Sequence, residues 1–116
     1  MTKGKVVLVP FPFDDLTAAK VRPVVCLTDP IGPHRHIIVA FISSQMPPVS
    51  MATDLVLEPR QNDFPTTGLR VASALRLHRL VTLTTTLIQR ELGELSPARQ
   101  KEMDGKLLIL FGLKSS

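Results

Sequence analysis

The sequence predicts a mainly β domain, a small barrel or a sandwich, completed by one C-terminal helix. Short runs of β-branched and aliphatic residues follow one another through the first half of the chain, separated by prolines and polar loops. Apolar residues at clear helical spacing are found only near the C-terminal end. The chain has 116 residues, of which 44% are hydrophobic and 21% charged, which suits a single domain spanning residues 1–116.

The first half of the sequence predicts four strands, at residues 5–10, 23–28, 36–42 and 54–58. The connector between the second and third strands, residues 29–33, contains two prolines and a glycine and is a predicted turn. Two adjacent prolines, Pro47 and Pro48, exclude regular structure soon after the third strand. The loop that contains them is therefore a candidate border of a binding site, where it could contact a substrate or a partner.

Residues 69–83 alternate between apolar and polar side chains and predict a fifth strand. One face would carry Leu69, Val71, Leu75 and Leu77, with Arg79 as an optional fifth member. The other face would carry a cationic row of Arg70, Arg76 and His78. This row either meets solvent or faces a nucleic acid, and the pattern does not separate the two. In residues 82–86 the strand and helix propensities conflict, which predicts a short irregular element.

The C-terminal element is predicted to be a helix over residues 97–111 that packs on the barrel. Ser96 is a suitable N-cap, and Pro97 suits the first helical position. Gly112 then ends the helix. The residues at helical spacing are Met103, Leu107, Leu110 and Phe111.

Composition limits the possible functions. The net charge of +4 and the pI near 9.7 fit a polyanionic partner, although a mildly basic surface accounts for them equally well. The single cysteine, Cys26, excludes an internal disulfide and is expected to be a buried, inert thiol. His34 and His36 flank a turn and lack further ligands, so neither a metal nor another cofactor is expected. No apolar run approaches the ~20 residues of a membrane span, which together with the N-terminal sequence predicts a cytoplasmic protein.

The candidate site combines Arg22, at the start of the second strand, with Ser43 and Ser44, at the end of the third. An arginine and a hydroxyl pair so placed can converge on one phosphate, because the planar guanidinium donates two parallel hydrogen bonds. By spacing alone, the commoner arrangement is an ion pair between Arg22 and Asp14 or Asp15, with the serines forming a turn.

Five stretches in order give the chain a resemblance to a known family. They are Gly4 to Phe13, Lys20 to Val25, Ala40 to Gln45, Gly68-Leu69 with Ser73, and Leu92-Gly93 with Leu95-Ser96. Over essentially its whole length the chain resembles the MazF/PemK family of bacterial toxins. The resemblance implies an SH3-like small barrel (MazF/CcdB-like) with a C-terminal α-helix. It also implies a homodimer that cleaves single-stranded RNA without a metal and is held inactive by an antitoxin.

The resemblance also implies roles for single residues. Arg22 and Ser43 match the positions most closely tied to cleavage, where Arg22 would stabilise the phosphorane and Ser43 would hydrogen-bond a nonbridging oxygen. Residues expected to bind RNA are Lys20, Ser44, Gln45, Arg70, Ser73, Arg76 and His78. Some members carry an acid where this chain has Ser73, which leaves the general base unassigned, with Asp15 and His78 as weak candidates.

The expected function is a sequence-selective endoribonuclease that acts on mRNA, leaves a 2′,3′-cyclic phosphate and a 5′-hydroxyl, and is inhibited by an acidic antitoxin. The antitoxin is expected to bind a basic cleft bounded by the 14–21 loop, the 45–51 loop and the cationic row. One alternative is a CcdB-like toxin that binds gyrase without catalysis, although those relatives use a C-terminal tryptophan and this chain has none. A second alternative is an inactive nucleic-acid-binding barrel.

Overall fold

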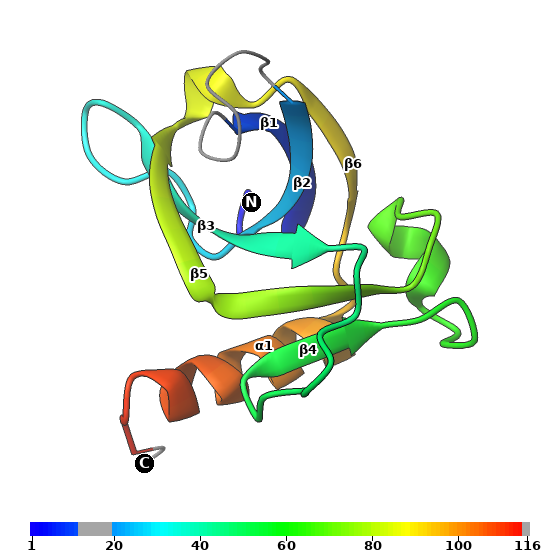
Figure 1. The fold of residues 1–116 in the computed structure, drawn as a ribbon. Coiled ribbons are helices and arrows are strands. Elements are labelled where there is room, and N and C mark those ends of the chain that lie inside the picture. Colours follow the sequence, from blue (N-terminus) through cyan, green and yellow to red (C-terminus); the bar gives the residue numbers. More distant parts are fainter. Residues whose placement is uncertain (12–19, 115–116) are drawn as a thin grey trace.

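The computed structural model describes residues 1–11 and 20–114, and this part of the chain forms six strands, two short 3₁₀ helices and one α-helix (Figure 1). The strands are β1 (Lys5–Phe11), β2 (Lys20–Cys26), β3 (His36–Ser43), β4 (Asp54–Leu57), β5 (Ser73–Thr84) and β6 (Arg90–Glu94). The helices are η1 (Phe64–Thr67), η2 (Thr85–Leu87) and α1 (Pro97–Leu110).

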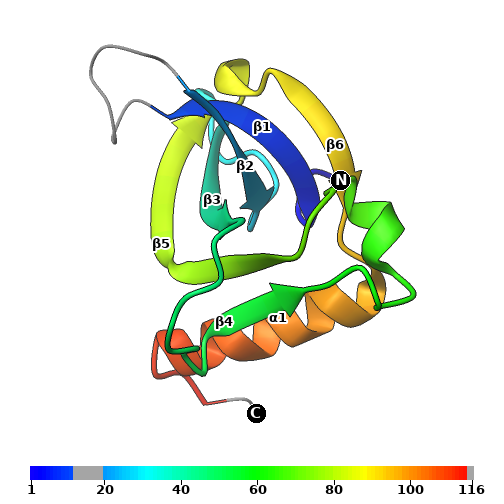
Figure 2. The ribbon, with the colours of Figure 1, turned by 45° about the vertical axis from the view of Figure 1, so that its right-hand side comes forward.

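All six strands belong to one antiparallel sheet with the order β4-β5-β3-β2-β1-β6. The sheet curls into a partly open barrel, as Figures 1 and 2 show. The long strand β5 bends where its pairing with β3 shifts: Ala40 lies opposite Leu80, whereas the next residue, Phe41, lies opposite Arg76. With this bulge, β5 pairs with every residue of β3 and also, at its beginning, with β4.

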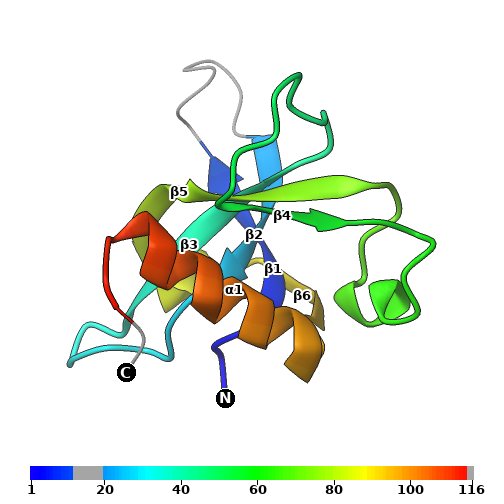
Figure 3. The same cartoon turned by 90° about the horizontal axis from the view of Figure 1, so that it is seen from below.

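The core consists of two apolar clusters on opposite faces of the sheet, because neighbouring residues of a strand point to opposite sides. Val6 belongs to the first cluster and Val7 to the second. Helix α1 runs along β4 and β5 (Figure 3) and contributes the fully buried Met103 to the first cluster. The predicted packing of the C-terminal helix on the barrel is therefore confirmed.

Two glycines bring η1 and β6 into close contact at the open side of the barrel. A Cβ atom on Gly93 would overlap the backbone carbonyl of Thr66, and one on Gly68 would overlap that of Leu92. Gly68 also has a φ of +74°, a conformation that favours glycine. The Thr66 hydroxyl donates a 3.2 Å hydrogen bond to the Glu94 carbonyl, so η1 is fastened to the edge strand.

The predicted mainly β fold with a C-terminal helix is confirmed. It differs from the prediction at the ends of elements and by one further strand, β6, which the sequence did not predict. Strand β2 begins at Lys20, three residues before the predicted start. Proline has no backbone N–H to donate, but Pro23 is tolerated in β2 because pairing with β3 begins only at Val24. No hydrogen bond to β3 is therefore lost at position 23. Residues 82–86 are divided between the end of β5 and η2.

The predicted alternation over residues 69–83 is wrong in its first part and at its centre. Strand β5 begins at Ser73, so Arg70 precedes the strand and does not share a strand face with Arg76. The bulge then interrupts the period of two between Arg76 and Leu80. The cationic row of Arg70, Arg76 and His78 therefore does not form as one face.

Candidate active site

The register of β2 and β3 places Arg22 and Ser43 on one face of the sheet. Val24 pairs with Phe41, and residues two positions apart in a strand point to the same side. Arg22 lies two residues before Val24, and Ser43 lies two residues after Phe41. Because β2 and β3 are antiparallel, the two residues lie at the same edge of the sheet. The convergence predicted from the sequence thus follows from strand register.

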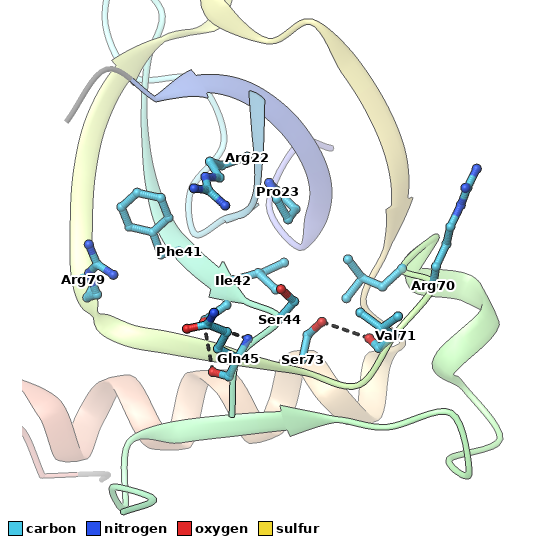
Figure 4. A pocket seen from close by; sticks show the side chains of 12 residues that line it. Arg22, Pro23, Phe41, Ile42, Ser44, Gln45, Arg70, Val71, Ser73 and Arg79 are labelled. Atoms are coloured by element: carbon cyan, nitrogen blue, oxygen red, sulfur yellow. Dashed lines mark hydrogen bonds between the residues drawn. The ribbon is translucent and has the colours of Figure 1, made fainter. Parts of the chain in front are cut away.

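A cleft of about 470 Å³ opens at this edge (Figure 4). It is lined by residues 22–23, 41–45, 69–71, 73 and 79. These residues come from the beginning of β2, the end of β3 with the two residues after it, the segment before β5, and the bend of β5. Four separate parts of the sequence therefore meet at the site.

The lining of the cleft is positively charged. Three arginines, Arg22, Arg70 and Arg79, contribute to it, and among the lining residues of the described structure there is neither a carboxylate nor an imidazole. Arg22 is half-buried and forms no ion pair with any described residue. A half-buried guanidinium that has no counter-ion among the described residues favours an anionic ligand.

Arg79 is held in place by an aromatic ring. The Cζ atom of its guanidinium lies 4.5 Å from the centre of the Phe41 ring, within the range of a cation–π contact. Figure 4 shows Phe41 and Arg79 at one side of the cleft and Arg70 at the other. The two sides of the site thus offer different chemistry: a ring with a guanidinium over it, and an exposed arginine.

The serines of the cleft are also turn-forming residues. The Ser43 hydroxyl donates to the Gln45 carbonyl at 3.0 Å and accepts from the Gln45 backbone N–H at 3.2 Å. The Ser73 hydroxyl is buried and donates to the Val71 carbonyl at 2.9 Å. Ser43 therefore stabilises the chain reversal at the end of β3 and lies in the cleft at the same time.

Other residues predicted to bind RNA lie outside the lining of the cleft: Lys20, Arg76 and His78. Lys20 is exposed at the first position of β2, and His78 is exposed on β5. Arg76 forms an ion pair with Asp54. Asp14 and Asp15 lie outside the described residues.

Sequence reasoning missed the position of Arg79. The alternation gives Arg79 only as an optional fifth member of the apolar face, whereas in the structure it lies at the bulge opposite Ala40 and Phe41 and lines the cleft. A bulge depends on pairing between strands distant in sequence, so no local pattern around Arg79 could have indicated it.

The groups considered for metal or thiol chemistry are placed elsewhere. His34 is exposed in the turn before β3 and His36 is exposed at its first position, with ring centres 5.9 Å apart. Across residues 1–11 and 20–114, no cluster of three or more His, Cys, Asp or Glu could hold a metal ion. Cys26 is fully buried, as predicted, and burial raises the pKa of its thiol to about 11, which disfavours the reactive thiolate. In the same part of the chain, no helix is long and apolar enough to cross a membrane.

Several solved structures have the same fold. The Mycobacterium tuberculosis toxin MazF-mt6 is 19% identical, with a TM-score of 0.73 over 96% of this chain and 99% of that one. An endoribonuclease in complex with its cognate antitoxin, from Mycobacterial species, is 14% identical, with a TM-score of 0.72 over 100% of this chain and 99% of that one. The MazE–MazF structure from Deinococcus radiodurans is 16% identical, with a TM-score of 0.68 over 98% and 97%.

The sequence comparisons differ in what they find. Among curated proteins no sequence matches this chain. The family profile described as "PemK-like, MazF-like toxin of type II toxin-antitoxin system" matches residues 2–111, almost the entire length. The resemblance noted in the sequence motifs is therefore confirmed, and the chain belongs to the PemK-like, MazF-like family of type II toxins.

Proposed function

We propose that this toxin is a metal-independent endoribonuclease that cleaves single-stranded RNA in the arginine-lined cleft. The observation that carries the proposal is the convergence of Arg22 and Ser43 at a cleft whose described lining contains three arginines and no carboxylate. Two of the similar structures are described as endoribonucleases, which supports the same reaction class.

In the proposed reaction, the RNA supplies its own nucleophile. The 2′-oxygen attacks the adjacent phosphorus, the bond from phosphorus to the 5′-oxygen breaks, and a 2′,3′-cyclic phosphate and a 5′-hydroxyl are formed. Because the attack is intramolecular, positioning and stabilisation of charge supply most of the acceleration. Arg22 would stabilise the developing phosphorane charge. The Ser43 hydroxyl has one proton, so it would donate a hydrogen bond to a nonbridging oxygen after turning away from the Gln45 carbonyl.

Proton transfer needs groups beyond these two. Arginine has too high a pKa to exchange protons readily. Asp15 and His78 stay the candidates for acid or base. His78 lies outside the lining of the cleft and would need a rearrangement to reach the substrate.

We also propose that an acidic antitoxin segment blocks the cleft and that the toxin acts as a homodimer. Two similar structures are described as a complex with a cognate antitoxin and as MazE–MazF. A disordered acidic segment suits an arginine-lined cleft, because it places carboxylates where the RNA phosphates would bind. Its affinity should fall as salt rises, and it should compete with RNA.

The reaction is tested with purified protein and a long RNA in the presence of EDTA. Cleavage should continue, and the products should carry 5′-hydroxyl ends. Activity that disappears in EDTA and returns with Mg²⁺ would contradict the proposed mechanism. RNA left intact under all conditions while the toxin binds gyrase would favour the CcdB-like alternative.

Arg22 is tested by single-turnover cleavage. Arg22→Ala should lower the rate about 100-fold or more, since one transition-state donor contributes roughly 3 kcal/mol. Arg22→Lys should restore little of the rate, because an ammonium cannot reproduce the planar fork. Arg60→Ala is the matched control, as Arg60 is 85% exposed and pairs with Glu58 outside the cleft. Equal losses of RNA affinity and rate in Arg22→Ala would mean that Arg22 only binds a phosphate and does not stabilise the transition state.

A further inference from the structure

The contact between Arg79 and Phe41 is a feature of the cleft that the proposed reaction does not use. Phe41 is only half-buried at the edge of the second apolar cluster and lines the cleft. The guanidinium of the exposed Arg79 lies over its ring at 4.5 Å. The ring restricts where the guanidinium can lie, so a flat cationic group is already positioned before any ligand binds.

This pair lies beside the residues proposed to act on the phosphate. Phe41 is directly opposite Val24, two residues from Arg22 on the same face of β2, and it is two residues from Ser43 on the same face of β3. A nucleotide whose phosphate contacts Arg22 would therefore have its base within the part of the cleft that Phe41 and Arg79 line.

We propose that Arg79, held over Phe41, forms a nucleobase-binding subsite next to the reacting phosphate. The base stacks on the guanidinium, so this subsite contributes to the selection of the cleavage position. The inference rests on the proposed function, because it takes single-stranded RNA as the ligand of the cleft.

The chemistry of the two side chains favours a base over a second phosphate. Bases of single-stranded RNA stack on guanidinium planes and on aromatic rings. A guanidinium stacked on an aromatic ring keeps its positive charge and offers a plane, which an ammonium does not. Among the described residues of the cleft, no aromatic ring other than Phe41 is present, on the side opposite Arg70. Arg70 is exposed and is suited to phosphate contact instead.

The test measures whether the affinity lost in Arg79→Ala depends on the presence of one particular base in the strand. The probe is a seven-nucleotide strand of mixed sequence with 2′-deoxyribose throughout, which lacks the nucleophile and cannot be cleaved. Seven further strands each carry one abasic position. Dissociation constants are measured for the wild type and for Arg79→Ala with every strand.

We expect one abasic position to weaken wild-type binding by roughly 5- to 150-fold, the range for loss of one stacked base. In Arg79→Ala, binding to the intact strand should be weaker by a similar factor, and the same abasic position should have little further effect. If Arg79→Ala weakens binding equally for every strand, Arg79 contacts only the backbone and the proposal is overturned.

Two further variants separate stacking from charge. Arg79→Lys should behave like Arg79→Ala if the plane matters, and like the wild type if only the charge matters, which would overturn the proposal. Arg90→Ala removes an exposed arginine of β6 outside the cleft and should leave all the dissociation constants nearly unchanged. Thermal unfolding of each variant, with melting temperatures close to the wild type, confirms that the fold is retained.

The experiment also distinguishes this subsite from the proposed reaction. Base-dependent binding through Arg79 in a protein that cleaves no RNA would support the subsite and contradict the endoribonuclease assignment. RNA cleavage by a protein whose binding shows no base dependence on Arg79 would support the reaction and overturn the subsite.

Discussion

Arg76 and Asp54 form a largely buried ion pair across β5 and β4. Arg76 Nε donates a 2.8 Å hydrogen bond to Oδ1 of Asp54, whose side chain has no exposed area. The other carboxylate oxygen accepts from the backbone N–H of Met51 at 3.0 Å. Because the two residues are directly opposite in the strand register, the pair fastens the beginning of β4 to β5.

Breaking this pair should destabilise the fold. Arg76→Ala should lower the free energy of unfolding by about 3 kcal/mol or more, because it leaves a carboxylate buried without its counter-ion. Adding Asp54→Asn should recover part of the loss by removing that charge. Urea unfolding measures both, with Arg60→Ala as the control, since its exposed pair with Glu58 contributes at most about 1 kcal/mol.

A similar small loss for Arg76→Ala and Arg60→Ala would show that the buried pair does not stabilise the sheet. The result also decides how the cleft is probed. Charge reversal at Arg76 would disturb the fold, so charge reversal at Arg70, which lines the cleft, is better suited to testing RNA or antitoxin affinity.

Ser43 should tolerate threonine but not alanine. Ser43→Ala should lower single-turnover cleavage by about 10- to 100-fold, since a hydrogen bond to a charged group contributes about 1.5–3 kcal/mol. Ser43→Thr keeps the hydroxyl at the end of β3 and should stay within about 3-fold of the wild type. Ser50→Ala, in the loop beyond the lining of the cleft, is the control. Cleavage by Ser43→Ala at the wild-type rate would exclude a role for the hydroxyl in cleavage.

Two glycine substitutions should have opposite effects on stability. Gly93→Ala would place a methyl group against the backbone carbonyls of η1 and should cost about 1–3 kcal/mol or more. Gly105→Ala, in α1, meets nothing within 4 Å and should raise the free energy of unfolding by up to about 1 kcal/mol. Denaturant titration of both variants checks the prediction, and stabilisation by Gly93→Ala would contradict the close contact of η1 with β6.

Asp63 should make stability depend on pH in the acid range. It accepts hydrogen bonds from the Ser96 hydroxyl at 2.6 Å and from Arg99 Nε at 3.1 Å, and Ser96 also caps α1. The Ser96 hydroxyl, followed by Arg99, holds the pKa of Asp63 below its ordinary value of 3.8. The carboxylate is therefore favoured in the folded state.

A lowered pKa in the folded state gives stability that is complete above pH 3.8 and lost as the pH falls through the folded pKa. The wild type should therefore melt at a higher temperature than Asp63→Asn near neutral pH, and the difference should shrink below pH 3.8. Melting temperatures at a series of pH values measure this. A difference that stays constant down to low pH would mean that the charge of Asp63 does not stabilise the contact with α1.

The sequence alone determined the local elements and the family. Helix α1 was predicted within one residue at its C-terminal end, because Ser96, Pro97 and the apolar spacing act within a few residues of one another. The strands of the first half were recognised for the same reason, since β-branched runs and proline loops are local signals. The resemblance of the motifs around Arg22 and Ser43 to a known family predicted the fold and the function class, and the family is confirmed.

Tertiary structure decided what each charged residue contacts. Arg76 and Arg79 lie three residues apart in β5, yet the first is paired with Asp54 and the second lies over Phe41 in the cleft. The contacts of the two side chains depend on a bulge between β3 and β5 and on the register of β4 with β5. Both arise from pairing between segments distant in the chain, where local periodicity carries no information, because a shift in register changes which face a side chain occupies.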